Sequence, residues 1–153
     1  MIDHVAHGVY ISGYRAIYSA QILREVGITH VLKLYEDGPY WPADFVVCDN
    51  PLPDGEPIPA EQLRQGVAFV REQVEAGRSV LVQCGAGISR SSTFVLAFLV
   101  DRGYDLKDAW QILKTNHSDA NPHPALWYSL IAHYHLPYST QDVAQWTGHW
   151  PAI

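Results

Sequence analysis

The stretch Val82-Gln83-Cys84-Gly85-Ala86-Gly87-Ile88-Ser89-Arg90-Ser91 decides the fold, because it joins a strand pattern to a helix pattern. The apolar run 79–82 leads in and the apolar run 92–100 leads out, which predicts a strand, a tight loop and a helix N-terminus. Such a geometry aims backbone N–H groups and the positive end of a helix dipole at one point. Cys84 at that point is favoured as the nucleophilic thiolate, and Arg90 offers a planar fork for two phosphate oxygens. The stretch therefore predicts phosphate-monoester hydrolysis through a phosphocysteine.

Strand and helix patterns alternate on both sides of this stretch. Strands are predicted at 9–11, 30–34, 44–48 and 80–83, and helices at 16–26, 60–76, 92–102, 106–113 and 124–134. Four prolines within 51–59 predict a loop. The alternation predicts an α/β three-layer sandwich, with a central mostly parallel sheet flanked by helices, in a single domain over residues 1–153. Residues 136–153, with Trp146 and Trp150, are expected to pack back as a short helix and tail.

Composition limits the classes of function. The 153 residues carry 10 basic and 16 acidic side chains, a net charge of −6, which disfavours nucleic acid and anionic membranes as partners. We see no targeting segment, and the longest apolar run, 94–100, is too short to span a membrane. Two cysteines make no disulfide framework, so we expect a reducing, cytoplasmic location.

Residues 82–91 resemble the signature loop of the cysteine-based protein tyrosine phosphatases, and residues 86–91 have the form common in their dual-specificity branch. Residues 8–13 and 27–32 are similar to the first two strands of that branch, and 106–113 and 121–134 to its last two helices. The resemblance covers about residues 5–135 and implies a phosphotyrosine-phosphatase-like fold. It implies that Ser91 assists breakdown of the phosphoenzyme and that the phosphate is held by Gly85, Ala86, Gly87, Ile88, Ser89 and Arg90.

Two of these roles have structural alternatives. Cys84 could be a buried core thiol, but that does not explain the glycine-containing loop and the arginine that follow it. Ser91 could cap the following helix instead of, or as well as, acting on the phosphoenzyme, and Ser89 or Ser92 could share that duty.

A carboxylic acid is expected to protonate the leaving oxygen and then to activate water. Asp54 and Asp49 both precede Cys84 at a suitable distance, and chemistry alone does not separate them. Asp54 lies before Gly55 in the proline-rich loop, on a segment able to close over substrate, so we expect it to be the acid. The run 49–57 also resembles the acid loop of the regenerating-liver and cell-cycle phosphatase branches, in which the aspartate before the glycine is the acid.

Gln83 departs from the family pattern, which has histidine immediately before the nucleophile. A glutamine amide still donates hydrogen bonds but brings no charge, so we expect weaker support of the thiolate. This departure keeps a weakly active or non-catalytic phosphate-binding module as an alternative function.

Other residues suggest weaker hypotheses. Cys48 could form a disulfide with Cys84, although a core thiol is the simpler interpretation. A metal site built from His117, His123, His133, His135 and His149 matches no known ligand spacing, so no metal or cofactor is expected. The expected substrate is a phosphorylated protein or a small phosphomonoester. Phosphoinositides are disfavoured because no lysine lies between Cys84 and Arg90.

Overall fold

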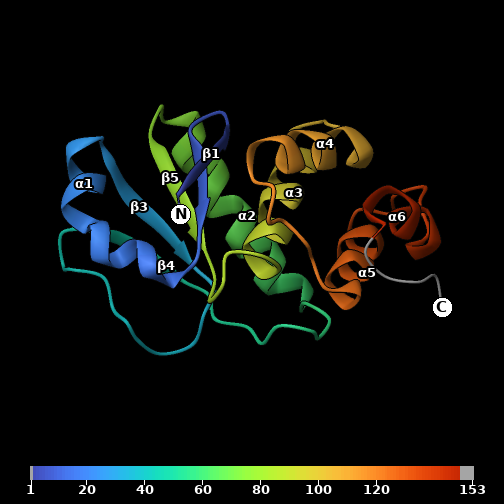
Figure 1. The fold of residues 1–153 in the computed structure, drawn as a ribbon, viewed down its shortest axis with the longest axis horizontal. Coiled ribbons are helices and arrows are strands. Elements are labelled where there is room, and N and C mark those ends of the chain that lie inside the picture. The colour runs from blue at the N-terminus through green and yellow to red at the C-terminus, as the bar shows by residue number, and fades with distance from the viewer. Residues whose placement is uncertain (1, 149–153) are drawn as a thin grey trace.

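The computed structural model describes residues 2–148, with a five-stranded sheet at their centre (Figure 1). The strands are β1 (Asp3–Ala6), β2 (Val9–Ser12), β3 (Ile28–Lys33), β4 (Val46–Asp49) and β5 (Ser79–Gln83). Their order in the sheet is β1-β2-β5-β3-β4. Only the β1–β2 pair is antiparallel within the part that the structure describes, so the predicted mostly parallel sheet is confirmed.

The helices follow the predicted order, with small shifts at their ends. They are the 3₁₀ helix η1 (Tyr14–Ser19), α1 (Ala20–Glu25), α2 (Ala60–Glu75), α3 (Arg90–Asp101), α4 (Leu106–Asn116), α5 (Pro124–His133) and α6 (Thr140–Thr147). In place of the single helix predicted for 16–26, the chain makes η1 and then α1, and Gly27 follows with a left-handed φ of 83°. The chain turns sharply after β2, and the tighter 3₁₀ geometry suits such a short connecting piece.

Strand β5 has an apolar residue on both faces of the sheet, as a central parallel strand requires. Val80 and Val82 belong to the large core formed with helices α2 to α5, whereas Leu81 belongs to a smaller core with η1 and α1. Helices therefore cover both faces, and the predicted three-layer α/β sandwich is confirmed (Figure 1).

Among the helices of residues 2–148, α3 is the most buried, since all of residues 91–99 are buried. A helix that is apolar on every side is stable only when it is surrounded by other elements, which explains the long apolar run in the sequence. Its N-terminus lies directly after the loop that carries Cys84. The core of the protein thus holds this loop at a defined position.

Strand β1 was not predicted. It lies at the edge of the sheet and is joined to β2 by His7 and Gly8, which both have positive φ angles. A segment of four residues is too short to show the alternating pattern by which a strand is predicted from sequence. Its strand conformation is stabilised by antiparallel pairing with β2.

The tail forms the expected short helix, α6, which begins with a capping box between Ser139 and Asp142. Trp146 packs against the large core, and Trp150 lies outside the described residues. Within residues 2–148, no helix has the length and apolarity needed to cross a membrane.

Candidate active site

Residues 84–89, together with Arg90 at the start of α3, form the signature loop that joins β5 to α3. The loop packs against the turn after β2: the Cys84 N–H donates to the Ser12 carbonyl (3.4 Å), and the Tyr14 N–H donates to the Gly85 carbonyl (3.0 Å). Gly87 has a φ of 75°, and a Cβ atom there would lie 2.5 Å from the Gly13 nitrogen. The close contact between loop and turn therefore requires glycine at position 87.

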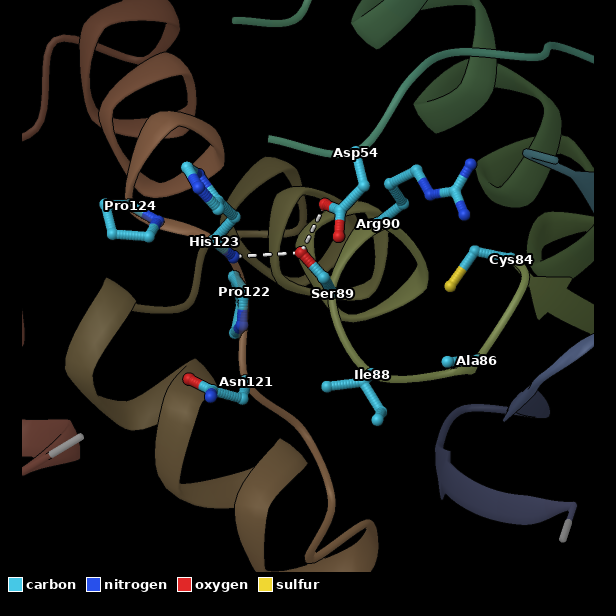
Figure 2. Close-up of a pocket in the computed structure, with 10 residues that line it drawn as sticks. All are labelled: Asp54, Cys84, Ala86, Ile88, Ser89, Arg90, Asn121, Pro122, His123 and Pro124. Atoms are coloured by element: carbon cyan, nitrogen blue, oxygen red, sulfur yellow. Dashed lines mark hydrogen bonds between the residues drawn. The ribbon is translucent and has the colours of Figure 1, made fainter. Parts of the chain in front are cut away.

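A pocket of about 300 Å³ opens above this loop (Figure 2). Cys84 lies in its floor and is only 1% exposed. The walls come from three separate segments: Asp54 from the loop after β4, Ile88 to Arg90 from the signature loop, and residues 121–124 from the segment that leads into α5. The structure thus brings a thiol, a carboxylate and a guanidinium to one small pocket.

The two aspartates considered for the general acid, Asp54 and Asp49, lie in different surroundings. Asp54 lines the pocket, and its Oδ1 atom accepts hydrogen bonds from the Ser89 hydroxyl (2.7 Å) and the Gly55 N–H (3.0 Å). Asp49 is absent from the described lining of the pocket and pairs with the buried Lys33 ammonium at 3.3 Å. Of these two aspartates, Asp54 is the one whose side chain lines the pocket above Cys84.

Arg90 is held by the segment that carries Asp54. Its Nη1 atom donates to the Leu52 carbonyl (2.9 Å) and, more weakly, to the Leu34 carbonyl (3.5 Å). Its Nε atom is buried and has no hydrogen-bond partner among the described residues. One edge of the guanidinium is thus used by the protein, and the Nε–Nη2 edge can take two oxygens of an anion.

Ser91 lies next to the cysteine: the Cys84 thiol donates to the Ser91 hydroxyl oxygen at 3.2 Å, and Ser91 is fully buried. Helix α3 begins without a hydrogen bond from a side-chain cap, so the helix-capping alternative finds no support for Ser91. Ser89 immediately precedes the helix, but its hydroxyl does not cap it. The hydroxyl donates a hydrogen bond to Asp54 and accepts one from the His123 N–H (2.9 Å).

Gln83 is fully buried below the loop, and both ends of its amide are bonded. Its oxygen accepts from the Trp41 ring N–H (2.5 Å), and its nitrogen donates to the Gly13 carbonyl (3.2 Å). The side chain therefore ties the strand end to the turn that supports the loop.

Lys33 and the neighbouring Tyr35 and Tyr40 do not belong to the described lining of the pocket. The Lys33 ammonium lies over the Tyr35 ring at 4.3 Å, and it donates to the Tyr35 carbonyl (2.9 Å). Burial raises the pKa of Tyr35 to about 12, with a further contribution from the charge of Asp49. These residues stabilise the loop after β3.

Cys48 is too far from Cys84 for a disulfide. Leu32 pairs with Cys48 on β4 and with Val82 on β5, so β3 lies between β4, which carries Cys48, and β5, which Cys84 directly follows. Two strand spacings amount to about 10 Å, beyond the Cα separation of about 7 Å that a disulfide tolerates. Burial, Asp49 and Glu72 raise the pKa of the Cys48 thiol, as expected of a core thiol.

Residues 121–124 also line the pocket, which their sequence pattern did not predict. His123 lines the pocket and accepts from the Ala125 N–H through Nδ1, which caps α5. The signal in the sequence was the Asn-Pro-His-Pro run, which predicts a loop before a helix but not its position over Cys84. Within residues 2–148, no three His, Cys, Asp or Glu side chains gather as metal ligands would.

Comparisons with known proteins identify the family of this chain. The sequence model of the family described as "Dual specificity phosphatase, catalytic domain" matches residues 9–135. The chain therefore belongs to the family of dual-specificity phosphatase catalytic domains.

Among its relatives are two curated proteins and a solved structure. The MAP kinase phosphatase with leucine-rich repeats protein 3 of Dictyostelium discoideum is 30% identical over 134 residues, 84% of this chain and 15% of that protein. Dual specificity protein phosphatase 1 of Arabidopsis thaliana is 32% identical over 121 residues, 77% of this chain. The crystal structure of human DUSP28 has a TM-score of 0.78 and 26% identity, covering 87% of this chain and 95% of that one. This chain spans only 15% and 61% of the lengths of the two curated relatives.

Proposed function

We propose that this protein is a cysteine-dependent protein tyrosine or dual-specificity phosphatase. The observation that carries the proposal is the pocket in which the Cys84 thiol lies with the Asp54 carboxylate and the Arg90 guanidinium. A nucleophile, a proton donor and an anion clamp are the three groups that hydrolysis through a phosphocysteine requires. Membership of the dual-specificity family supports phosphorylated proteins as the substrate class.

In the first step the Cys84 thiolate attacks phosphorus. The sulfur–phosphorus bond forms as the bond to the leaving oxygen breaks, and Asp54 gives that oxygen a proton. The Arg90 fork and the backbone N–H groups of the loop stabilise the negative charge on the equatorial oxygens. The N-terminus of α3 contributes its dipole at the same place.

Asp54 is arranged for this proton transfer. Its Oδ1 atom already accepts two hydrogen bonds, from Gly55 and Ser89. The proton of a carboxylic acid therefore belongs on Oδ2, because a protonated Oδ1 has less capacity to accept. This arrangement gives Ser89 a role in orienting the acid as well as in holding phosphate.

In the second step water attacks the phosphocysteine, and Asp54, now ionised, takes a proton from that water. The phosphorus–sulfur bond breaks, inorganic phosphate leaves, and the Cys84 thiolate is restored. The Ser91 hydroxyl lies 3.2 Å from the sulfur and can donate to the departing thiolate. Ser91 thereby assists the breakdown of the phosphoenzyme.

Within the substrate class, phosphotyrosine proteins are the first expectation, and phosphoserine or phosphothreonine proteins and small phosphomonoesters are the alternatives. The loop residues 85–89 hold no lysine for further phosphate groups, and the net charge of −6 does not attract polyanions. A cytoplasmic location belongs to the same proposal, since the nucleophile must stay reduced.

Purified protein tested on p-nitrophenyl phosphate, phosphotyrosine and phosphothreonine peptides and soluble inositol phosphates, with and without chelator, checks this proposal. We expect hydrolysis that chelator leaves unchanged. Cys84→Ser should abolish turnover but keep inorganic phosphate binding, because Arg90 and the backbone make the cradle. Arg90→Lys should lose most activity, since a point charge does not replace a bidentate fork.

Turnover by the Cys84→Ser protein at the wild-type rate would exclude the covalent mechanism. Wild-type protein that binds phosphate but hydrolyses none of the substrates would instead support the phosphate-binding module.

A further inference from the structure

His117 connects the N-terminal strand to the signature loop. It lies at the C-terminal end of α4 and is 4% exposed. Its Nδ1 atom lies 2.6 Å from Oδ2 of Asp3 on β1, and its Nε2 atom lies 2.6 Å from the Gly87 carbonyl oxygen. A carboxylate and a carbonyl only accept hydrogen bonds, so each ring nitrogen of His117 faces an acceptor.

The bond to Gly87 matters because of the peptide unit to which that carbonyl belongs. In a trans peptide the C=O group and the N–H group of the next residue point in opposite directions. A Gly87 carbonyl held outward by His117 therefore turns the Ile88 N–H toward the inside of the loop. That N–H is one of the donors expected to bind phosphate.

Two other loop carbonyls are held from outside in the same way. The Tyr14 N–H donates to the Gly85 carbonyl (3.0 Å), and the Asn121 N–H donates to the Ile88 carbonyl (2.9 Å). Both of these donors are backbone groups, which a substitution does not remove. His117 is the side chain that does the same work, so its contribution can be measured by mutation.

We propose that His117 is a positioning residue for phosphate binding, which aims the Ile88 N–H at the anion by holding the Gly87 carbonyl. Asp3 fixes the orientation of the imidazole through Nδ1, so a residue from the edge strand acts on the loop through His117. The inference rests on the proposed function, because it assumes that the signature loop binds phosphate.

Two substitutions separate the two bonds of the imidazole. An asparagine amide reaches about as far as Nδ1 and a glutamine amide about as far as Nε2. His117→Asn should keep the Asp3 contact and lose the loop contact, and His117→Gln should do the reverse. We expect His117→Asn to raise the dissociation constant of inorganic phosphate about tenfold and to lower kcat/KM similarly. His117→Gln should stay near the wild type in both quantities.

Titration calorimetry with inorganic phosphate and kinetics with p-nitrophenyl phosphate measure these effects, with thermal midpoints recorded for each protein. His7→Asn is the matched control: His7, in the turn between β1 and β2, bonds to the Tyr104 hydroxyl (2.8 Å) and does not touch the loop. Its φ of 55° suits asparagine, and it should leave phosphate binding unchanged. Asp3→Ala, at a partly exposed site, should weaken phosphate binding about threefold by releasing the imidazole.

Equal phosphate affinity in His117→Asn and His117→Gln, whether weakened or unchanged, would overturn the inference. If His117→Asn does not fold, Asp3→Ala decides, and wild-type affinity in that variant would overturn it too. A wild-type protein that does not bind inorganic phosphate would instead refute the proposed function, on which the inference depends.

Discussion

Replacing Asp54 with asparagine should remove proton transfer and little else. The Asp54 Oδ1 atom accepts from the Ser89 hydroxyl at 2.7 Å and from the Gly55 N–H at 3.0 Å. An asparagine oxygen can accept both bonds, which leaves its NH₂ group where the acid has Oδ2. That NH₂ group does not give up a proton at neutral pH, so the asparagine side chain should keep the position of Asp54 but should not act as a general acid.

The size of the effect depends on the leaving group. A positioned general acid contributes about 10²- to 10⁴-fold, or roughly 3–5 kcal/mol of activation free energy at 1.36 kcal/mol per factor of ten. We expect a loss in this range for phosphotyrosine peptides, whose leaving oxygen needs the proton, and a much smaller loss for p-nitrophenyl phosphate. The variant should also lose the alkaline limb of its pH–rate profile, which reports deprotonation of the acid.

Steady-state kinetics on both substrates from pH 5 to 9 measure this prediction, with phosphate affinity as a check on the loop. Asp49→Asn is the matched control, because Asp49 bonds to Lys33 and does not line the pocket. If Asp49→Asn loses activity selectively on phosphotyrosine and Asp54→Asn does not, the assignment of the acid is wrong and the two roles exchange.

Three further predictions concern the loop and the second cysteine. Gln83→His should leave the rate of Cys84 alkylation by iodoacetamide unchanged, because both ends of the Gln83 amide are already bonded; a faster rate at mildly acidic pH would contradict this. Gly87→Ala should abolish phosphate binding, since its Cβ meets backbone at 2.5 Å, whereas Gly77→Ala, with a similar φ and open space, should cost only about 1–2 kcal/mol in denaturant unfolding. Cys48 should be alkylated slowly at pH 7 in the Cys84→Ser protein, because its raised pKa leaves little thiolate; rapid labelling, followed by mass spectrometry, would refute its assignment as a partly buried core thiol.

Local patterns predicted the order of most elements. The strand at 80–83 and the helix from 60 to 76 agree with β5 and α2 to within a residue at each end. The apolar run after Arg90 predicted a buried helix, and α3 is that helix. Strand β1 was missed because an edge strand of four residues owes its form to pairing with β2, which no local pattern reports.

The sequence by itself determined the strand–loop–helix junction, and with it the position of Cys84 and Arg90, because both belong to one short continuous segment. Tertiary structure decided which groups meet this loop. Asp54 rather than Asp49 reaches the pocket because the chain after β4 continues past the sheet edge toward α5. His117 and His123 come to the loop from 30 or more residues away in the chain, through the packing of α4 and α5 on α3. Such contacts depend on how helices pack over the whole core, and no spacing within the sequence contains that information.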